Sequence, residues 1–149
     1  MAEKKRLTAR QYLEQLQMID MQINQDIERL DEMKESALCT GAIDYSRERV
    51  QTSPKSDKIG ADVTRYITLN EKINAEIDSY VDAKEQIIRE IRELHDFYYV
   101  QVLFKVYVQF KNLKVAAEEM ERSYAFVRNV HKKALEAFEK THKTLYYLY

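Results

Sequence analysis

The chain contains little of what ends a helix or cross-links a fold: among its 149 residues are two Gly, one Pro, one Cys and no Trp. So few Gly and Pro residues leave almost no material for the turns that a β-sheet needs. The single cysteine, Cys39, excludes a disulfide within the chain and a cysteine-rich zinc site. The remaining residues are 33% charged and follow helical periods, so the sequence predicts an all-α fold.

Long apolar runs are also missing. No segment approaches the roughly 18 to 20 consecutive apolar residues that span a bilayer. The first ten residues, MAEKKRLTAR, carry charges with no apolar stretch behind them. We therefore expect a cytoplasmic protein that has no membrane partner.

Residues typical of catalytic and metal sites are scattered or absent. The chain has no Gly-rich phosphate loop and no nucleophile motif, and His95, His131 and His142 are far apart in the sequence. A histidine on a helix flank is more often a surface residue than a metal ligand. Glu118 and Glu119 are adjacent, so they point to different faces of a helix and make a poor acid–base pair. We expect no enzyme, no cofactor and no metal.

Two long helical patterns fill residues 1–38 and 59–95. The first runs without interruption from Thr8, the expected N-cap, to Ala37, and the second alternates steps of four and three as coiled coils do. The first pattern comprises Tyr12, Leu16, Ile19, Ile23, Ile27, Leu30 and Met33; the second comprises Ile59, Val63, Tyr66, Asn70, Ile73, Ile77, Tyr80, Lys84, Ile87, Ile91 and Leu94.

This spacing predicts a long antiparallel helical hairpin that resembles a coiled coil. The polar seam residues Asn70 and Lys84 would fix its register or its partner number, and a homodimer through the same seam is left open. The alternative is that both stripes face a compact core.

Residues 39–58 separate the two patterns. Residues 39–60 hold the only Pro, both Gly and most of a Ser and Thr cluster, which predicts a loop of about twenty residues. The basic residues of this loop would contact phosphate or an acidic partner if the loop is functional, whereas a solvated linker is the favoured alternative. They are Arg47, Arg49, Lys55 and Lys58.

Residues 96–149 are predicted to form a helix-turn-helix domain with a C-terminal tail. A helix over 97–110 is apolar nearly all round and is expected to be its scaffold. The apolar tail, residues 145–149, is expected to pack back on the domain or on a second copy.

Two short helices joined by a turn follow that scaffold helix. Asn112 is the expected N-cap of the first, which would carry Val115, Ala116 and Met120 inward. The chain then breaks around Glu121 and Arg122, and Ser123 is the expected N-cap of the second helix. Its inward residues at helical spacing are Phe126, Val127, Val130, Ala134 and Phe138.

The outer face of this second helix carries base-edge readers, a small residue for close approach and phosphate-binding cations. The predicted DNA-binding residues are Arg122, Ser123, Tyr124, Ala125, Arg128, Asn129, Lys132 and Lys133. Residues 96–149 hold nine Lys or Arg against six Asp or Glu, whereas residues 1–95 hold fifteen against nineteen. The C-terminal part is thus the basic one, although a Lys-rich solvated face is common on any amphipathic helix.

Roughly the last 45 residues resemble region four of bacterial sigma factors, and the match reaches the run HKKALEAFEK. Over nearly the whole chain, the layout resembles the ArpU-type regulators of phages and prophages of Gram-positive bacteria. The motif residues are Thr8, Ala9, Tyr12, Leu13 and Gln15, then Glu48, Arg49, Val50, Gln51, Ser53, Asp57 and Lys58. The sequence departs from the family at Ala116, Glu121 and Phe126, where Ile, Gly and Trp are usual.

This resemblance implies a sigma-like transcriptional regulator of late phage genes that binds double-stranded DNA in the cytoplasm of a bacterial host. The base readers would be Tyr124, Ala125, Arg128 and Asn129, with Arg122 and Lys132 or Lys133 near phosphate. RNA polymerase is a further expected partner. The alternative is a non-enzymatic coiled-coil interaction module that binds RNA polymerase or a phage packaging partner.

Overall fold

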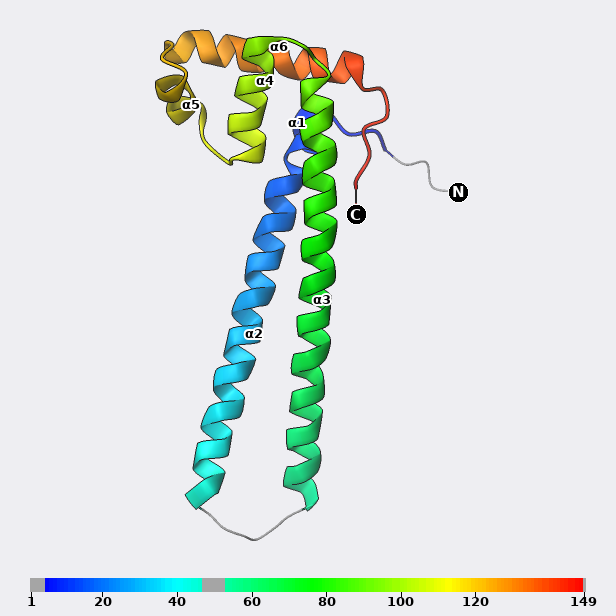
Figure 1. The fold of residues 1–149 in the computed structure, drawn as a ribbon, viewed down its shortest axis with the longest axis vertical. Coiled ribbons are helices and arrows are strands. Elements are labelled where there is room, and N and C mark those ends of the chain that lie inside the picture. The colour runs from blue at the N-terminus through cyan, green and yellow to red at the C-terminus, as the bar shows by residue number, and fades with distance from the viewer. Residues whose placement is uncertain (1–4, 47–52, 149) are drawn as a thin grey trace. The chain divides into compact units, whose positions relative to one another are not determined.

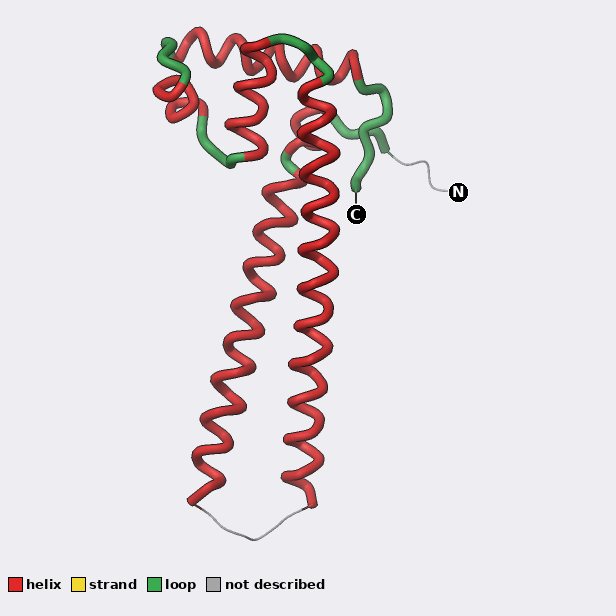
Figure 2. The backbone as a smooth tube through the Cα atoms, in the orientation of Figure 1, coloured by secondary structure: helices red, strands yellow, loops and turns green. Residues whose placement is uncertain are grey.

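The computed structural model describes the backbone of residues 5–46 and 53–148, and the side chains of residues 5–36 and 60–148. Within these residues the chain is helical and has no β-strand, as Figure 1 and Figure 2 show. The predicted all-α fold class is therefore confirmed. Among the described helices, none combines the length and the apolar character needed to cross a membrane.

The chain divides into two compact units. Unit 1 comprises Met1–Asp20 and Ser79–Tyr149, and unit 2 comprises Met21–Asp78. The two longest helices, α2 (Gln15–Ser46) and α3 (Ser53–Arg92), contribute residues to both units.

The first helix, α1 (Ala9–Leu13), begins at a capping box. Thr8 Oγ1 accepts a hydrogen bond from Gln11 N, and the Gln11 side chain accepts one from Thr8 N, so the predicted cap is confirmed. The prediction of one uninterrupted helix is wrong, because α1 ends before Glu14. At this break the buried amide of Gln15 donates to Tyr12 O and accepts from the N–H of Leu148, which ties the C-terminal tail to the helix junction.

The helices α2 and α3 extend into the segment for which the sequence predicts a loop. The prediction is wrong over residues 39–46 and 53–58, which are helical. Pro54 lies in the first turn of α3, where a missing N–H breaks no helical hydrogen bond. A glycine inside a helix costs only about 1 kcal/mol, so Gly41 does not end α2.

The rest of that predicted loop lies outside the described residues. This holds for residues 47–52 and for every side chain from 37 to 59. The predicted phosphate contacts of the loop therefore lie outside the described side chains, namely Arg47, Arg49, Lys55 and Lys58.

In unit 2, α2 and α3 lie side by side, and each buries a narrow stripe (Figure 1). The buried apolar side chains are Ile23 on α2 and Leu69 and Ile73 on α3. Asp26 is also buried in this stripe and interacts with the half-buried carboxyl group of Glu76 on α3, whose Oε2 is buried without a hydrogen-bond partner. The polar residues of the seam are thus a pair of acids.

The predicted seam on α3 is displaced by one residue over much of unit 2. Val63 and Ile77, which it includes, are 50% and 38% exposed, and Asn70 is exposed as well. Tyr66 and Ile73 are the seam residues predicted correctly there. Heptad spacing fits both stripes equally well, so the sequence alone does not tell which of them packs on α2.

Two further seam predictions have mixed outcomes. On α2, Ile27 is 37% exposed because the neighbouring Asp26 takes the buried position. In unit 1, Ile87 and Ile91 are buried as predicted, while Lys84 is half-buried with its ammonium group 5.9 Å from the centre of a tyrosine ring.

Unit 1 is built around α6 (Tyr124–Thr141), which packs against α1, α4 (Phe97–Leu103) and α5 (Leu113–Glu119). The predicted packing of the tail on this unit is confirmed, because Leu145 is fully buried and its carbonyl accepts from Leu7 N at 2.8 Å. The fully buried side chains of unit 1 include Tyr12, Leu13, Leu16, Ile87, Ile91, Val102, Leu103, Val127, Phe138 and Leu145.

The predicted scaffold helix over 97–110 ends early and changes its winding. Asp96 caps α4 by accepting from Tyr98 N and Tyr99 N, and the chain continues as a π-helix, η1 (Phe104–Val108). Phe110 has a φ of 57° and is outside the helix. Phe97 is 70% exposed, so the start of this segment is not part of the core.

Candidate nucleic-acid interface

The first short helix of the candidate interface, α5, begins as the sequence predicts. Asn112 accepts a hydrogen bond from Val115 N at 2.8 Å, which confirms the N-cap. Ala116 and Ala117 are buried against the rest of unit 1. The predicted burial of Val115 is wrong, because its side chain is 37% exposed, and Met120 is half-buried.

The turn between α5 and α6 closes in a Schellman motif. Arg122 N donates to Ala117 O at 3.1 Å, and Glu121 N donates to Glu118 O at 3.2 Å. Glu121 has a φ of 56°, in the left-handed region that this motif usually fills with glycine. The predicted break at Glu121 and Arg122 is therefore confirmed, and it holds a strained glutamate.

The second helix, α6, is fixed by its cap and by one apolar face. Ser123 Oγ accepts from Phe126 N at 3.2 Å, as predicted. Phe126 is half-buried, whereas the other four predicted inward residues are buried. Those four are Val127, Val130, Ala134 and Phe138.

The opposite face of α6 is open to solvent. A helix turns by about 100° per residue, so the six predicted positions on α6 cover roughly half of its circumference, away from the buried residues. Lys132 and Ala125 are near the middle of this half, with Arg128 and Asn129 on either side of them. All six are exposed: Tyr124, Ala125, Arg128, Asn129, Lys132 and Lys133. We call this set the outer face of α6.

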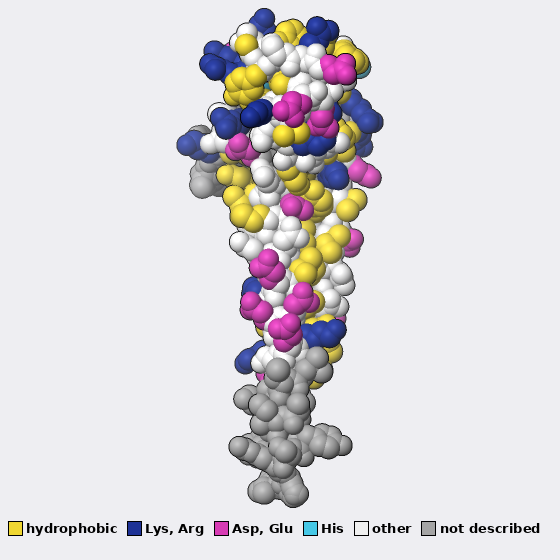
Figure 3. Space-filling model, turned by 90° about the vertical axis from the view of Figure 1, so that its left-hand side faces the viewer, with side chains coloured by type: hydrophobic (Ala, Val, Ile, Leu, Met, Phe, Trp, Pro, Cys, Tyr) yellow, Lys and Arg dark blue, Asp and Glu magenta, His cyan; other side chains and the backbone are white. Residues whose placement is uncertain are grey.

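Charge on the outer face is positive. Arg128, Lys132 and Lys133 make no ion pair with any residue that the structure describes. The carboxylate of Glu119, at the end of α5, is neutralised by Lys111 at 2.6 Å and Lys105 at 3.7 Å, and hydrogen bonding to Lys111 holds the pKa of Glu119 below its usual value. In Figure 3, Lys and Arg side chains are interspersed with acidic ones over the face shown, so a positive surface is local rather than general.

Arg122 differs from the other predicted phosphate contacts because it is held by aromatic rings. Its Nη2 donates to Tyr98 Oη at 2.6 Å, and its guanidinium lies 5.4 Å from the ring centres of both Tyr98 and Phe126. These contacts anchor the start of α6 to α4. Since a guanidinium has five N–H donors, others remain for a phosphate oxygen.

A hollow that no sequence pattern predicts lies beside α6, on the flank that carries His131. It has a volume of about 300 Å³, and His131 lines it together with Tyr107 of η1. π-helices are frequent at functional sites, and no pattern in the sequence predicts this π-helix. The remaining lining residues are Arg10, Glu14, Gln17, Val106, Phe110, Lys111, Asn112 and Leu113.

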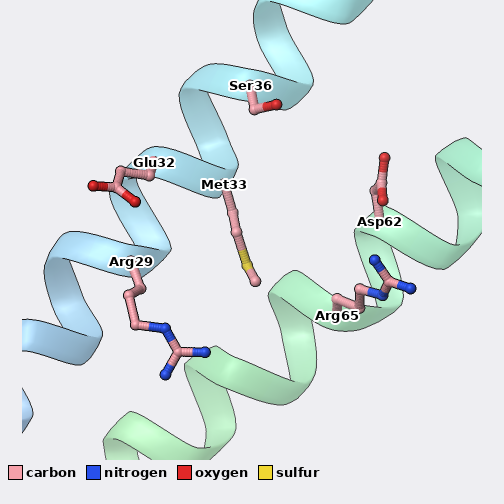
Figure 4. Close-up of a pocket in the computed structure, with 6 residues that line it drawn as sticks. All are labelled: Arg29, Glu32, Met33, Ser36, Asp62 and Arg65. Carbon is pink, nitrogen blue, oxygen red and sulfur yellow. The ribbon is translucent and has the colours of Figure 1, made fainter.

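Unit 2 has an open hollow of about 310 Å³ between its two helices, which Figure 4 shows. Met33 points from α2 toward α3, and the other residues that line the hollow are Ser36 and four charged ones: Arg29, Glu32, Asp62 and Arg65. Because this set mixes both signs of charge, it does not define a ligand. In the described part of the chain, no group of three or more His, Cys, Asp or Glu is placed to hold a metal ion.

Comparisons with family models, with curated proteins and with solved structures find no significant match to this chain. The resemblance to sigma region four and to ArpU-type regulators therefore stays a prediction.

Proposed function

We propose that the chain is a sequence-specific DNA-binding regulator of transcription, with α5, the turn and α6 acting as a helix-turn-helix. The observation that carries this proposal is the outer face of α6. It combines side chains that read base edges with three cations that have no ion-pair partner among the described residues. Four of the five inward residues of α6 are meanwhile buried in the core of unit 1.

In this proposal α6 enters the major groove. Arg128 donates two hydrogen bonds to guanine, and Asn129 pairs with adenine through its amide. Lys132, Lys133 and the free donors of Arg122 contact phosphate and set the orientation of the helix. Ala125 lets the helix approach the bases closely.

The family resemblance extends this proposal to its biological setting. It favours sigma-like control of late phage genes in the cytoplasm of a bacterial host, with RNA polymerase as a partner. The long helices α2 and α3 then form a hairpin that self-associates or contacts polymerase.

The test is a mobility shift of the purified protein on fragments of its own genomic neighbourhood, with competitor DNA and across a salt series. We expect one fragment to shift, and the affinity to fall steeply as salt rises, because binding releases counterions from phosphate. Absence of any shift at low salt rejects the proposal.

The second candidate is a non-enzymatic interaction module for RNA polymerase or a phage packaging protein. The observation that favours it is apolar exposure next to the start of α6, where Phe97 is 70% and Tyr124 51% exposed. Apolar docking of this kind resists salt, so a partner complex that persists at high salt without DNA supports this candidate.

A further inference from the structure

A second apolar stripe runs along α3, one residue after the stripe that packs on α2. Ile67 follows Tyr66, Asn70 follows Leu69, and the same offset continues along the helix. One residue rotates a helix by about 100°, so the second stripe faces solvent beside the α2 contact. Its members are Val63, Ile67, Asn70, Asn74, Ile77 and Val81, and we call them the outer stripe.

The outer stripe has the properties of an unfilled coiled-coil seam. Its steps are four, three, four, three and four residues, and none of its members is charged. Val63 and Ile67 are each 50% exposed, Ile77 is 38% and Val81 46% exposed. On α2, Met18, Met21 and Ile27 are exposed as well, but the next positions at heptad spacing after Met18 and Met21 are Gln25 and Glu28, so no apolar stripe continues there. The available seam is therefore on α3.

The order of residues in the outer stripe identifies what fits it. Read along the chain, the stripe is Val, Ile, Asn, Asn, Ile, Val, and it reads the same in the opposite direction. A two-fold axis at the level of residue 72 places each member opposite its own residue type in a reversed copy. In antiparallel coiled coils, each layer pairs a residue at heptad position a with one at position d. The outer stripe has Val63, Asn70 and Ile77 at d and Ile67, Asn74 and Val81 at a, so each of these pairs joins an a residue to a d residue.

We propose that the outer stripe binds the outer stripe of a second copy, with the two α3 helices antiparallel. Val63 packs on Val81, and Ile67 packs on Ile77 of the second copy. Asn70 meets Asn74, where the two amides hydrogen-bond each other and fix the register, because any heptad shift leaves an amide against an apolar side chain. The second copy thereby covers the exposed apolar side chains of α3.

Charges near the two-fold axis give this contact a salt dependence opposite to that of DNA binding by α6. Lys72 is on the far side of the helix, 3.7 Å from Glu76. Glu71 flanks the outer stripe and approaches Glu71 of the second copy. Salt screens that repulsion, so we expect self-association to strengthen as salt rises, whereas a phosphate contact weakens.

Cysteine cross-linking of the full chain without DNA tests the proposal. In a Cys39→Ser background, we expect a mixture of Ile67→Cys and Ile77→Cys proteins to form a disulfide-linked dimer, while each protein alone gives little. Both positions are exposed, so neither substitution removes a core side chain, and circular dichroism checks that each variant folds. The two sites are about 15 Å apart within one helix, too far for an internal bridge.

Thr68→Cys mixed with Ile77→Cys is the matched control, because Thr68 is exposed but about 100° around the helix from Ile67. Cross-linking of Ile67→Cys with itself would indicate a parallel pair and overturn the proposal. So would a monomeric mass of the unsubstituted chain at every concentration in sedimentation equilibrium. Because no DNA is present, either result leaves the proposed DNA binding to its own test.

Discussion

The hydroxyl of Tyr107 and Nε2 of His131 lie 2.7 Å apart in unit 1, with their rings stacked at 5.7 Å between centres. Burial holds the pKa of His131 below its usual value, and the nearby charge of Arg10 lowers it further. Burial also raises the pKa of Tyr107 to about 12. Both groups are therefore neutral at neutral pH, and they share one hydrogen bond in which the tautomer of the imidazole decides which of them donates.

We expect this pair to make the stability of unit 1 sensitive to acid. A histidine whose pKa is lowered by folding contributes stability that is fully present above its unfolded value, near 6.5, and is lost as pH falls below it. We expect His131→Gln to lower stability at pH 7 and to flatten its decline between pH 7 and pH 5. Thermal unfolding followed by circular dichroism over this range measures the effect.

The exposed His95 provides the control, through His95→Asn, because asparagine tolerates the positive φ of that residue. This variant should keep the decline of the unsubstituted protein. If His131→Gln declines equally steeply, the Tyr107–His131 pair is not the source of the acid sensitivity.

The acid pair of unit 2 is expected to act in the opposite direction. Burial and the interaction with Asp26 raise the pKa of Glu76, so its proton is bound more tightly in the folded state. The cations facing the pair are Lys72, 3.7 Å from Glu76, and Arg29, 3.0 Å from Asp26. When folding raises the pKa of a carboxyl group, the group does not destabilise the fold at a pH below its pKa in the unfolded chain. As the pH rises from there through the folded pKa, ionisation lowers the free energy of unfolding.

Glu76→Gln should therefore stabilise the protein at pH 7 and leave it unchanged near pH 4. Glutamine keeps an N–H donor for Asp26 and never ionises. Thermal unfolding at the two pH values measures the difference, and Glu28→Gln on the exposed surface of α2 is the control. A Glu76→Gln protein that gains equally at both pH values would show that the ionisation of Glu76 is not responsible.

The acid pair also marks where the sequence stops being informative. Heptad spacing locates two long helices, and the caps at Thr8, Asn112 and Ser123 are local signals that the structure confirms. The choice between Asn70 and Leu69 for the seam depends on the partner helix, which spacing does not encode. Burial of an acid such as Asp26 is predictable only once its partners are known.

At the candidate interface, too, the sequence predicts some features and not others. Exposure of Arg128, Lys132 and Lys133 follows from helical periodicity, and the sequence predicts it. The contact of Arg122 with Tyr98 does not follow, because the two residues are 24 positions apart and meet only after α4 packs on α6. The π-helix likewise has no local signature that separates it from an α-helix of the same composition.

Glu121 offers a test of the turn that precedes α6. Its φ of 56° is unfavourable for a residue with a Cβ atom, so Glu121→Gly should stabilise the protein by about 1 kcal/mol in chemical denaturation. Glu121→Gln keeps the Cβ atom and removes only the charge, and its stability should be unchanged. Equal stabilisation by both variants would attribute the effect to charge instead of backbone conformation.

In the proposed complex with DNA, variants of the outer face of α6 separate base reading from phosphate contact. We expect Arg128→Ala to weaken binding to the preferred fragment by about 1 to 3 kcal/mol while leaving non-specific binding nearly unchanged, because it removes a bidentate base contact. Lys132→Ala should weaken binding to all sequences alike and reduce the slope of log affinity against log salt by about 1. Mobility shifts on specific and competitor fragments across a salt series measure both quantities.

Lys72→Ala, on the exposed surface of unit 2, is the control for a lost cation. An Arg128→Ala protein that loses affinity equally for both fragments is using Arg128 as a phosphate contact, and the assignment of this residue to guanine would then be wrong.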